Sequence, residues 1–121
     1  MELEMTKKTI LIADDMEDIR ENITIGLGED DYNFLFAETG DEAFKLAKEN
    51  KINLVISDIA MPGGNGIELL KNLKDLPNAP VVIFLTGYAN MFPEDDNYKP
   101  DHVLEKPYRP EELKMIVEGL L

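Results

Sequence analysis

Acidic residues follow two apolar runs of the sequence. Asp14 and Asp15 come directly after Thr9–Ala13, and Asp58 follows Asn53–Ser57. Short, β-branched apolar runs are typical of parallel strands that are buried on both faces. The carboxyl ends of such strands meet at the edge where open α/β sheets bind ligands. We therefore expect three carboxylates to converge, where they would repel one another unless a cation or a reaction uses them.

Two more polar residues follow strand-like runs later in the chain. Thr86 comes directly after Val81–Leu85, and Lys106 lies shortly after Val103–Leu104. Carboxylate oxygens are ligands that Mg²⁺ prefers, and a carboxylate open to solvent can attack phosphorus to form an acyl phosphate. A threonine hydroxyl and a lysine ammonium can bind the phosphoryl oxygens. The residue types therefore point to Mg²⁺-dependent phosphoryl chemistry at one edge of a sheet.

Strand and helix signals alternate along the chain, and this alternation predicts the scaffold that positions these side chains. It indicates parallel strands joined by right-handed crossovers and covered by helices on both faces. We expect an α/β fold of the (βα)5 type, a doubly wound, flavodoxin-like parallel sheet of five strands in the order 2-1-3-4-5, in which the two acid-bearing strands are neighbours. The expected strands are residues 9–13, 32–37, 54–57, 81–85 and 103–104, and the expected helices are residues 16–27, 41–50, 66–73 and 110–120.

The apolar spacing separates a regular helix from an irregular one. Met16, Ile19, Ile23 and Leu27 recur at helical spacing and should share one inward face. Met91–Pro100 instead contains two prolines and a run of acids. The fourth helix, which should follow the fourth strand, is therefore expected to be irregular.

Length and charge limit the classes of function. The chain has 121 residues, which fits one domain over residues 1–121, with residues 1–7 expected to be poorly ordered. Lys and Arg number 12 against 25 Asp and Glu, so the formal net charge is −13. A surface this acidic argues against binding to nucleic-acid phosphates or anionic membranes. No cysteine is present, which excludes disulfides, and no leader-like start or apolar stretch of ~20 residues occurs, so we expect a cytoplasmic protein.

Four motifs occur in the order and at the spacing of a known family. They are Ile10–Asp15, Asp58–Pro62 with Gly66 after it, Phe84–Gly87 and Glu105–Tyr108. With these motifs the chain resembles, from about Lys8 to Leu121, the receiver domains of two-component response regulators, which have the CheY-like fold. Each motif is modest alone, whereas all four in order are highly specific.

The resemblance implies a role for each acidic residue. Asp58 would be the phosphoacceptor. Asp15 would bind Mg²⁺ directly, Asp14 largely through water, Asp58 by its carboxylate and Ala60 by its backbone carbonyl. Mn²⁺ could take the place of Mg²⁺ at the same ligands.

The resemblance also covers the residues after the fourth and fifth strands. Thr86 and Lys106 would contact the phosphoryl group, and the Lys106–Pro107 peptide would be cis, an option open to bonds before proline. Three departures concern the output. Val103 stands where the family often has an aromatic switch residue, and Met16 stands where Glu is common. The segment Met91–Pro100, with two prolines and a run of acids, stands where the family usually has a well-formed fourth helix.

The implied partners are a histidine kinase or phosphotransfer protein, which supplies the phosphoryl group from a phosphohistidine, and a downstream protein target. The domain would be a signalling switch rather than a metabolic enzyme. We expect a monomer or weak dimer that binds neither nucleic acid nor a membrane. It would be either a stand-alone receiver or part of a longer regulator or hybrid kinase.

Simpler interpretations exist for each residue taken alone. Paired aspartates after a strand are more often a turn or a helix N-cap, and Lys106 alone would be an exposed lysine. His102 has no partner at metal-ligand spacing, and Ser57 has no evident base, so both are expected to be structural. The joint placement of the acids, Thr86 and Lys106 at one sheet edge favours a site.

Two other classes of protein fit the sequence less well. A phosphatase of the haloacid dehalogenase type needs an Asp-x-Asp motif, but Ala60 stands where the second acid would follow Asp58. A flavodoxin-like FMN carrier needs a Ser-, Thr- or Gly-rich first loop, and Asp14 and Asp15 would repel the FMN phosphate.

Overall fold

The strands form one parallel sheet in the computed structural model, which describes residues 6–59, 66–87 and 98–121. The strand order is β2-β1-β3-β4-β5, so the predicted fold and order are confirmed. Each described element lies within one residue of its predicted ends. The strands are β1 (Thr9–Ala13), β2 (Asn33–Ala37), β3 (Leu54–Asp58), β4 (Val81–Thr86) and β5 (His102–Glu105), and the helices are α1 (Glu17–Leu27), α2 (Gly40–Glu49), α3 (Gly66–Lys74) and α4 (Pro110–Leu120).

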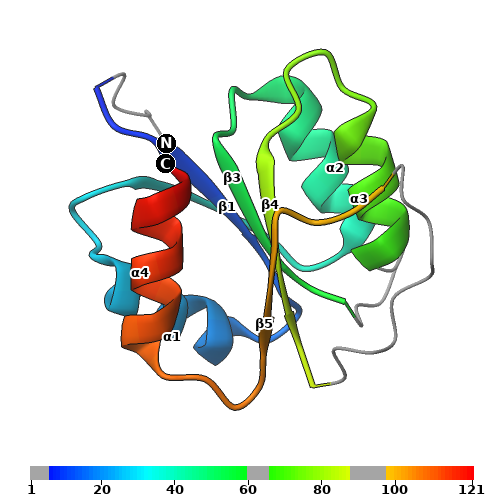
Figure 1. Ribbon diagram of the computed structural model, residues 1–121. Coiled ribbons are helices and arrows are strands. Elements are labelled where there is room, and N and C mark those ends of the chain that lie inside the picture. The colour runs from blue at the N-terminus through cyan, green and yellow to red at the C-terminus, as the bar shows by residue number, and fades with distance from the viewer. Residues whose placement is uncertain (1–5, 60–65, 88–97) are drawn as a thin grey trace.

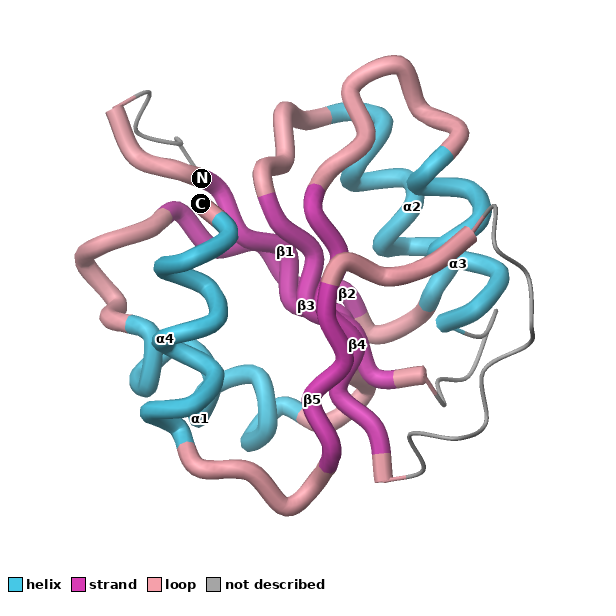
Figure 2. Tube along the Cα trace, viewed as in Figure 1, coloured by secondary structure: helices cyan, strands magenta, loops and turns pink. Residues whose placement is uncertain are grey.

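Helices cover both faces of the sheet, α1 and α4 on one side and α2 and α3 on the other (Figures 1 and 2). Successive strand residues point to opposite faces. Ile10 and Ile12 of β1 pack in the core under α1 and α4, while Leu11 and Ala13 pack in the core under α2 and α3. Because both faces are buried, β1 is apolar throughout and shows no polar alternation.

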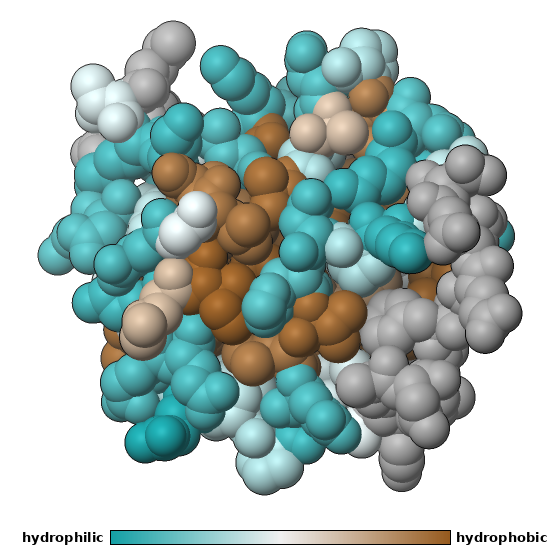
Figure 3. Space-filling model, viewed as in Figure 1, coloured by the Kyte–Doolittle hydropathy of each residue, from teal (hydrophilic) through white to brown (hydrophobic). Residues whose placement is uncertain are grey.

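The core under α4 reaches the surface along one side of the molecule. On the face shown in Figure 3, apolar side chains gather between α4 and β5. Val81, Ile116 and Leu120 are partly buried and pack against this core. Among residues 6–59, 66–87 and 98–121, no helix has the length and apolar character needed to cross a bilayer.

The helix ends have local causes in the sequence. α1 ends at Gly28, whose N–H donates to the carbonyl of Thr24 (3.0 Å) and whose φ of 108° is a conformation that favours glycine. α2 begins after Thr39, whose hydroxyl oxygen accepts a hydrogen bond from the N–H of Glu42 (3.1 Å). α4 begins with Pro110, where a missing N–H has no cost.

The short edge strand β5 is anchored by the residue before it. The N–H of Asp101 donates to the carbonyl of Val82 (2.8 Å). Its Oδ2 accepts hydrogen bonds from the N–H of Val82 (2.8 Å) and from Nζ of Lys74 (2.8 Å). Asp101 therefore joins the end of α3 and the start of β4 to the start of β5.

One detail of the predicted helices is wrong. Met16 is 53% exposed rather than inward, because it precedes α1 in an extended conformation and lies outside the helical repeat. In α3 the buried residues include Leu69, and Ile67 is half-buried and packs against the core under α2 and α3. The predicted irregular segment falls mostly outside the described residues, as does the expected disorder of residues 1–7; residues 98–100 are described and are not helical.

Candidate functional site

The sheet brings Asp14 and Asp58 to the same edge. Asp58 is the last residue of β3, and Asp14 directly follows β1. In the pairing of β1 with β3, Ala13 lies beside Ser57. Asp14 and Asp58 are the next residue of each chain segment, so they lie side by side. Asp14 is 3% exposed, while the side chain of Asp58 is 21% exposed. Asp58 can therefore be reached from solvent, whereas Asp14 is buried beside it.

The environment of Asp14 disfavours the ionised form of its carboxyl group. Burial raises the pKa of Asp14 above its usual value, a hydrogen bond from the N–H of Met16 to Oδ1 (2.9 Å) opposes this rise, and the charge of Asp58 adds to it. Lys106 lowers the pKa and Asp15 raises it, both to a smaller extent. The charges of these residues therefore act on one another, as the sequence predicted.

Lys106 connects β5 to the end of β3 and β4. Its Nζ lies 3.2 Å from Oδ2 of Asp58, and its backbone N–H donates to the carbonyl of Thr86 (2.7 Å). Thr86 ends β4 and is buried, with 5% exposure. The Lys106–Pro107 peptide is cis, as predicted.

The backbone around Asp58 is tightly packed. Ser57 is fully buried and its hydroxyl donates to the carbonyl of Asp58 (2.8 Å), so its side chain packs beside Asp58 and holds that backbone. Gly66, the first residue of α3, donates its N–H to the carbonyl of Ile59 (2.8 Å). A Cβ at Gly66 would lie 2.8 Å from Cα of Ile59 and 2.9 Å from the carbonyl oxygen of Asp58. Only glycine fits here without a shift of either α3 or the backbone of Asp58 and Ile59.

Two residues near the acids were not singled out from the sequence. Arg20 of α1 donates from Nη1 to the carbonyl oxygen of Asp14 (2.7 Å). Tyr108 is half-buried, and burial together with the charge of Asp14 raises the pKa of its hydroxyl. Tyr108 appeared only as part of a motif. No sequence pattern indicates the role of Arg20. Its contact is to a backbone oxygen six residues earlier, and this contact depends on the conformation of the turn between β1 and α1.

The predicted metal ligands are only partly brought together. Asp14 and Asp58 are adjacent, Asp15 is exposed, and Ala60 lies outside the described residues. In the part of the chain that is described, no group of three or more His, Cys, Asp or Glu side chains is arranged to hold a metal ion. The donors present suit Mg²⁺ in kind, since they are hard carboxylate oxygens whose mutual repulsion a cation would relieve. The metal-binding roles stay predictions.

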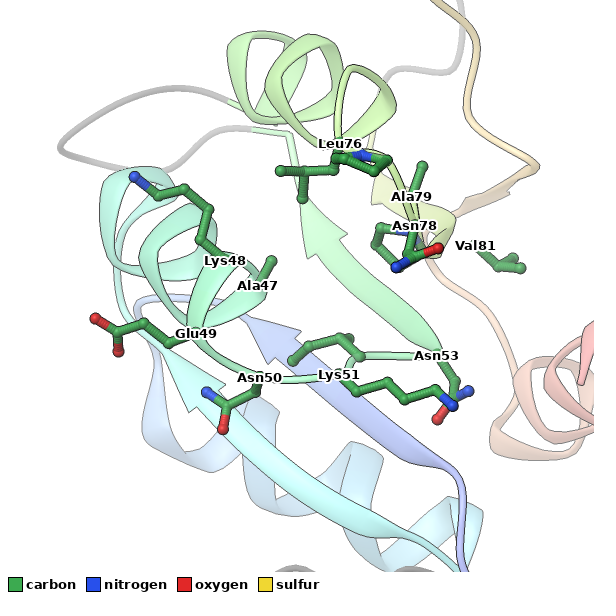
Figure 4. A pocket seen from close by; sticks show the side chains of 13 residues that line it. Ala47, Lys48, Glu49, Asn50, Lys51, Asn53, Leu76, Asn78, Ala79 and Val81 are labelled. Atoms are coloured by element: carbon green, nitrogen blue, oxygen red, sulfur yellow. The ribbon is translucent and has the colours of Figure 1, made fainter.

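A large hollow lies elsewhere. It has a volume of about 820 Å³ and is lined by residues 47–53 and 76–81, at the ends of the strands opposite to Asp58. In Figure 4, Lys51 extends toward Asn53, while Lys48 and Glu49 point outward. His102 is exposed on β5, as expected of a structural residue. The hollow lies at the end of the sheet opposite to Asp14, Asp58, Thr86 and Lys106, so it is separate from the site at the aspartates.

Comparison with known families decides among the interpretations of this site. The family model of the response regulator receiver domain matches residues 10–118. The chain belongs to the response regulator receiver family. A phosphatase of the haloacid dehalogenase type and an FMN carrier are thereby set aside, and the predicted resemblance is confirmed.

Three similar proteins show that receiver domains occur both inside longer proteins and as nearly whole proteins. Histidine kinase P4 of Formosa agariphila is 34% identical over 98% of the chain, which spans only 9% of that kinase. The response regulator receiver protein CpdR of Brucella abortus is 29% identical, with 94% of the chain and 97% of CpdR covered. The structure of TrrA of Thermotoga maritima in complex with Mg²⁺ and BeF is 34% identical, with a TM-score of 0.83 over 94% of this chain and 99% of that one.

Membership of the family establishes the general function. Receiver domains accept a phosphoryl group on an aspartate in two-component signalling, and they act as phosphorylation switches. They bind Mg²⁺, and they work with histidine kinases and downstream effectors. Which residues of this chain perform these tasks is a separate question.

Proposed function

We propose that Asp58 is the phosphoacceptor of this receiver. The observation that carries the proposal is the position of Asp58 at the end of β3, partly open to solvent, with Nζ of Lys106 at 3.2 Å and the buried Asp14 beside it. A nucleophile must be accessible, and Asp14 is not. Asp15 is exposed but is separated from the strand end by Asp14.

The proposed reaction is a transfer between two side chains. A carboxylate oxygen of Asp58 attacks the phosphorus of a phosphohistidine on a histidine kinase or phosphotransfer protein. The new P–O bond forms an acyl phosphate as the P–N bond breaks, and the donor imidazole leaves with its electron pair and takes up a proton. Hydrolysis of the acyl phosphate by water returns Asp58 to a carboxylate, so the domain is a switch rather than a metabolic enzyme.

Residues of this chain would bind the charge that moves in this reaction. Lys106 neutralises Asp58 before transfer and can follow the negative charge to a phosphoryl oxygen, while the hydroxyl of Thr86 can donate to a second oxygen. Asp14, Asp15, Asp58 and the carbonyl of Ala60 would hold the Mg²⁺. When bound, that ion supplies positive charge to the phosphoryl oxygens. The Mg²⁺ and BeF in the TrrA structure support this assignment.

The output of the switch is also part of the proposal. Thr86 ends β4 beside residues 87–100, so a contact between its hydroxyl and a phosphoryl group can move the start of that segment. The side chain of Val103 is too small to swing between a buried and an exposed position, as the aromatic switch residue of other receivers would. We expect a downstream protein partner, a monomer or weak dimer, no binding to nucleic acid or membranes, and a cytoplasmic location, which sedimentation and cell fractionation would test.

Loading with a small phosphodonor tests the assignment. Purified protein with Mg²⁺ and acetyl phosphate should gain one base-labile phosphoryl group in intact-mass spectrometry. Asp58→Asn should gain none, while the control Asp41→Asn, an exposed aspartate in the first turn of α2, should load like the wild type. An unchanged adduct in Asp58→Asn would overturn the assignment.

A further inference from the structure

Arg20 lies in an unusual setting for an arginine. Its side chain is only 13% exposed, although this residue type is rarely buried. Nη1 donates to the carbonyl oxygen of Asp14 at 2.7 Å, and Nη2 lies 3.8 Å from Oε1 of Glu38, whose side chain is 67% exposed. Arg20 thus links α1 to the ends of β1 and β2, and its short contact is the one to Asp14.

The carbonyl of Asp14 needs such a partner. It lies in the turn between β1 and α1, where neither a strand ladder nor a helix supplies a donor. The rest of Asp14 is also held: its N–H donates to the carbonyl of Ala37 (3.0 Å), and its carboxylate accepts from the N–H of Met16 (2.9 Å). The guanidinium of Arg20 completes the set of hydrogen bonds.

The contact to one carbonyl controls the next residue as well. The peptide group is planar, so the carbonyl of Asp14, the N–H of Asp15 and the Cα of Asp15 move together. A hydrogen bond that fixes this carbonyl therefore fixes the position of Cα of Asp15, the point at which its side chain leaves the backbone. Arg20 acts on both acids of the pair without touching either carboxylate.

We propose that Arg20 is a positioning residue for the Mg²⁺ site, holding the Asp14–Asp15 peptide in the orientation that metal binding requires. This inference rests on the proposed function, in which Asp14 and Asp15 hold the ion. Groups that orient metal ligands from outside typically change metal affinity by about 10- to 100-fold when they are removed. Loss of the Arg20 contact should therefore weaken Mg²⁺ binding by about tenfold.

The charge of Arg20 has the opposite effect on Mg²⁺. A guanidinium near the acids repels a cation, so loss of its charge alone would strengthen Mg²⁺ binding. The direction of change in a neutral variant therefore separates positioning from electrostatics. Arg20→Met suits this test, because it keeps much of the apolar stem that packs against the protein and loses both the charge and the donors.

The experiment is calorimetric titration of the metal-free protein with MgCl₂, at a temperature where circular dichroism shows each variant folded. Arg20→Met should bind Mg²⁺ about tenfold more weakly than the wild type. Arg20→Lys, which keeps the charge and one donor group, should be intermediate. Glu38→Gln should bind like the wild type, since its contact is long and exposed. At saturating Mg²⁺, loading of Arg20→Met by acetyl phosphate should return close to the wild-type rate.

The outcomes separate this inference from the proposed function. Unchanged or tighter Mg²⁺ binding by Arg20→Met, with normal binding by the wild type, would overturn the role of Arg20 alone. If Arg20→Met does not fold, equal Mg²⁺ affinity of Arg20→Lys and the wild type would overturn it. Wild-type protein that neither binds Mg²⁺ nor loads Asp58 would refute the proposed function and this role together.

Discussion

Gly66→Ala tests how closely α3 packs against the backbone that carries Asp58. The added methyl would start 2.8 Å from Cα of Ile59, 2.9 Å from the carbonyl oxygen of Asp58 and 3.1 Å from that of Ile59. All three atoms belong to the backbone, so no side chain can rotate away to make room. Either α3 or the end of β3 must move.

The size of the effect follows from two opposing contributions. Alanine is favoured over glycine in a helix by up to about 1 kcal/mol, and this gain is smaller at Gly66 because it is the first residue of α3. Overpacking against a rigid neighbour costs about 1–3 kcal/mol. We expect the free energy of unfolding to fall by about 0.5–2.5 kcal/mol, because the clash exceeds the gain.

Gly119→Ala is the matched control. Gly119 lies in α4, and a Cβ there would have no atom within 4 Å. The same chemical change should therefore leave the free energy of unfolding unchanged or raise it by less than about 0.5 kcal/mol, since Gly119 is next to the last residue of α4. Urea denaturation followed by circular dichroism, with equal slopes for all variants, measures both effects.

Phosphoryl loading gives an independent reading of Gly66→Ala. A shift of the reacting carboxylate by about 1 Å can cost about a hundredfold in rate, so a partial shift should slow loading of Asp58 by about tenfold, whereas Gly119→Ala should load normally. Wild-type stability together with wild-type loading in Gly66→Ala would refute this account of the packing.

Three other predictions concern the acids, a helix end and the output. Because the pKa of Asp14 is raised, its ionised form opposes folding; stability should fall as pH rises through the raised pKa. Asp14→Asn should therefore raise the metal-free melting temperature at pH 7, with the difference vanishing in acid, as thermal unfolding at several pH values would show; a lower melting temperature at pH 7 would contradict this. Gly28→Ala should cost about 1–2 kcal/mol in urea denaturation, since φ is 108°; an unchanged midpoint would contradict it. A phosphoryl mimic should change amide exchange at Thr86 and Gly87 while the methyl NMR signals of Val103 shift little, and a large shift at Val103 would contradict the absence of a side-chain switch.

The strands were predictable because each is a short apolar run that reports burial on both faces. The same argument located Asp14, Asp58, Thr86 and Lys106, since a residue after a parallel strand must lie at the carboxyl edge of the sheet. Strand order then followed from the crossover rule and from the resemblance.

Features that depend on side-chain reach were not predictable in this way. The residue types alone do not distinguish the burial of Asp14 from that of Asp15. Asp14 is buried and Asp15 is exposed, because the chain turns between them. The contact of Arg20 with a backbone oxygen leaves no pattern of residue types. The need for Gly66 arises from the backbone of Ile59, which no local propensity reports.

Asp101 has a consequence for how the protein behaves at high concentration. β5 has four residues and begins beside Ile83, so Val82 of β4 lies at a sheet edge that β5 does not cover. The edge of a sheet is a template on which a strand of another molecule can pair, and this is a route to aggregation. Asp101 occupies both the N–H and the carbonyl of Val82, as a strand residue of another chain would. Backbone pairing between Val82 and a strand of a neighbouring molecule is therefore blocked, which removes one site of edge-to-edge association at high protein concentration.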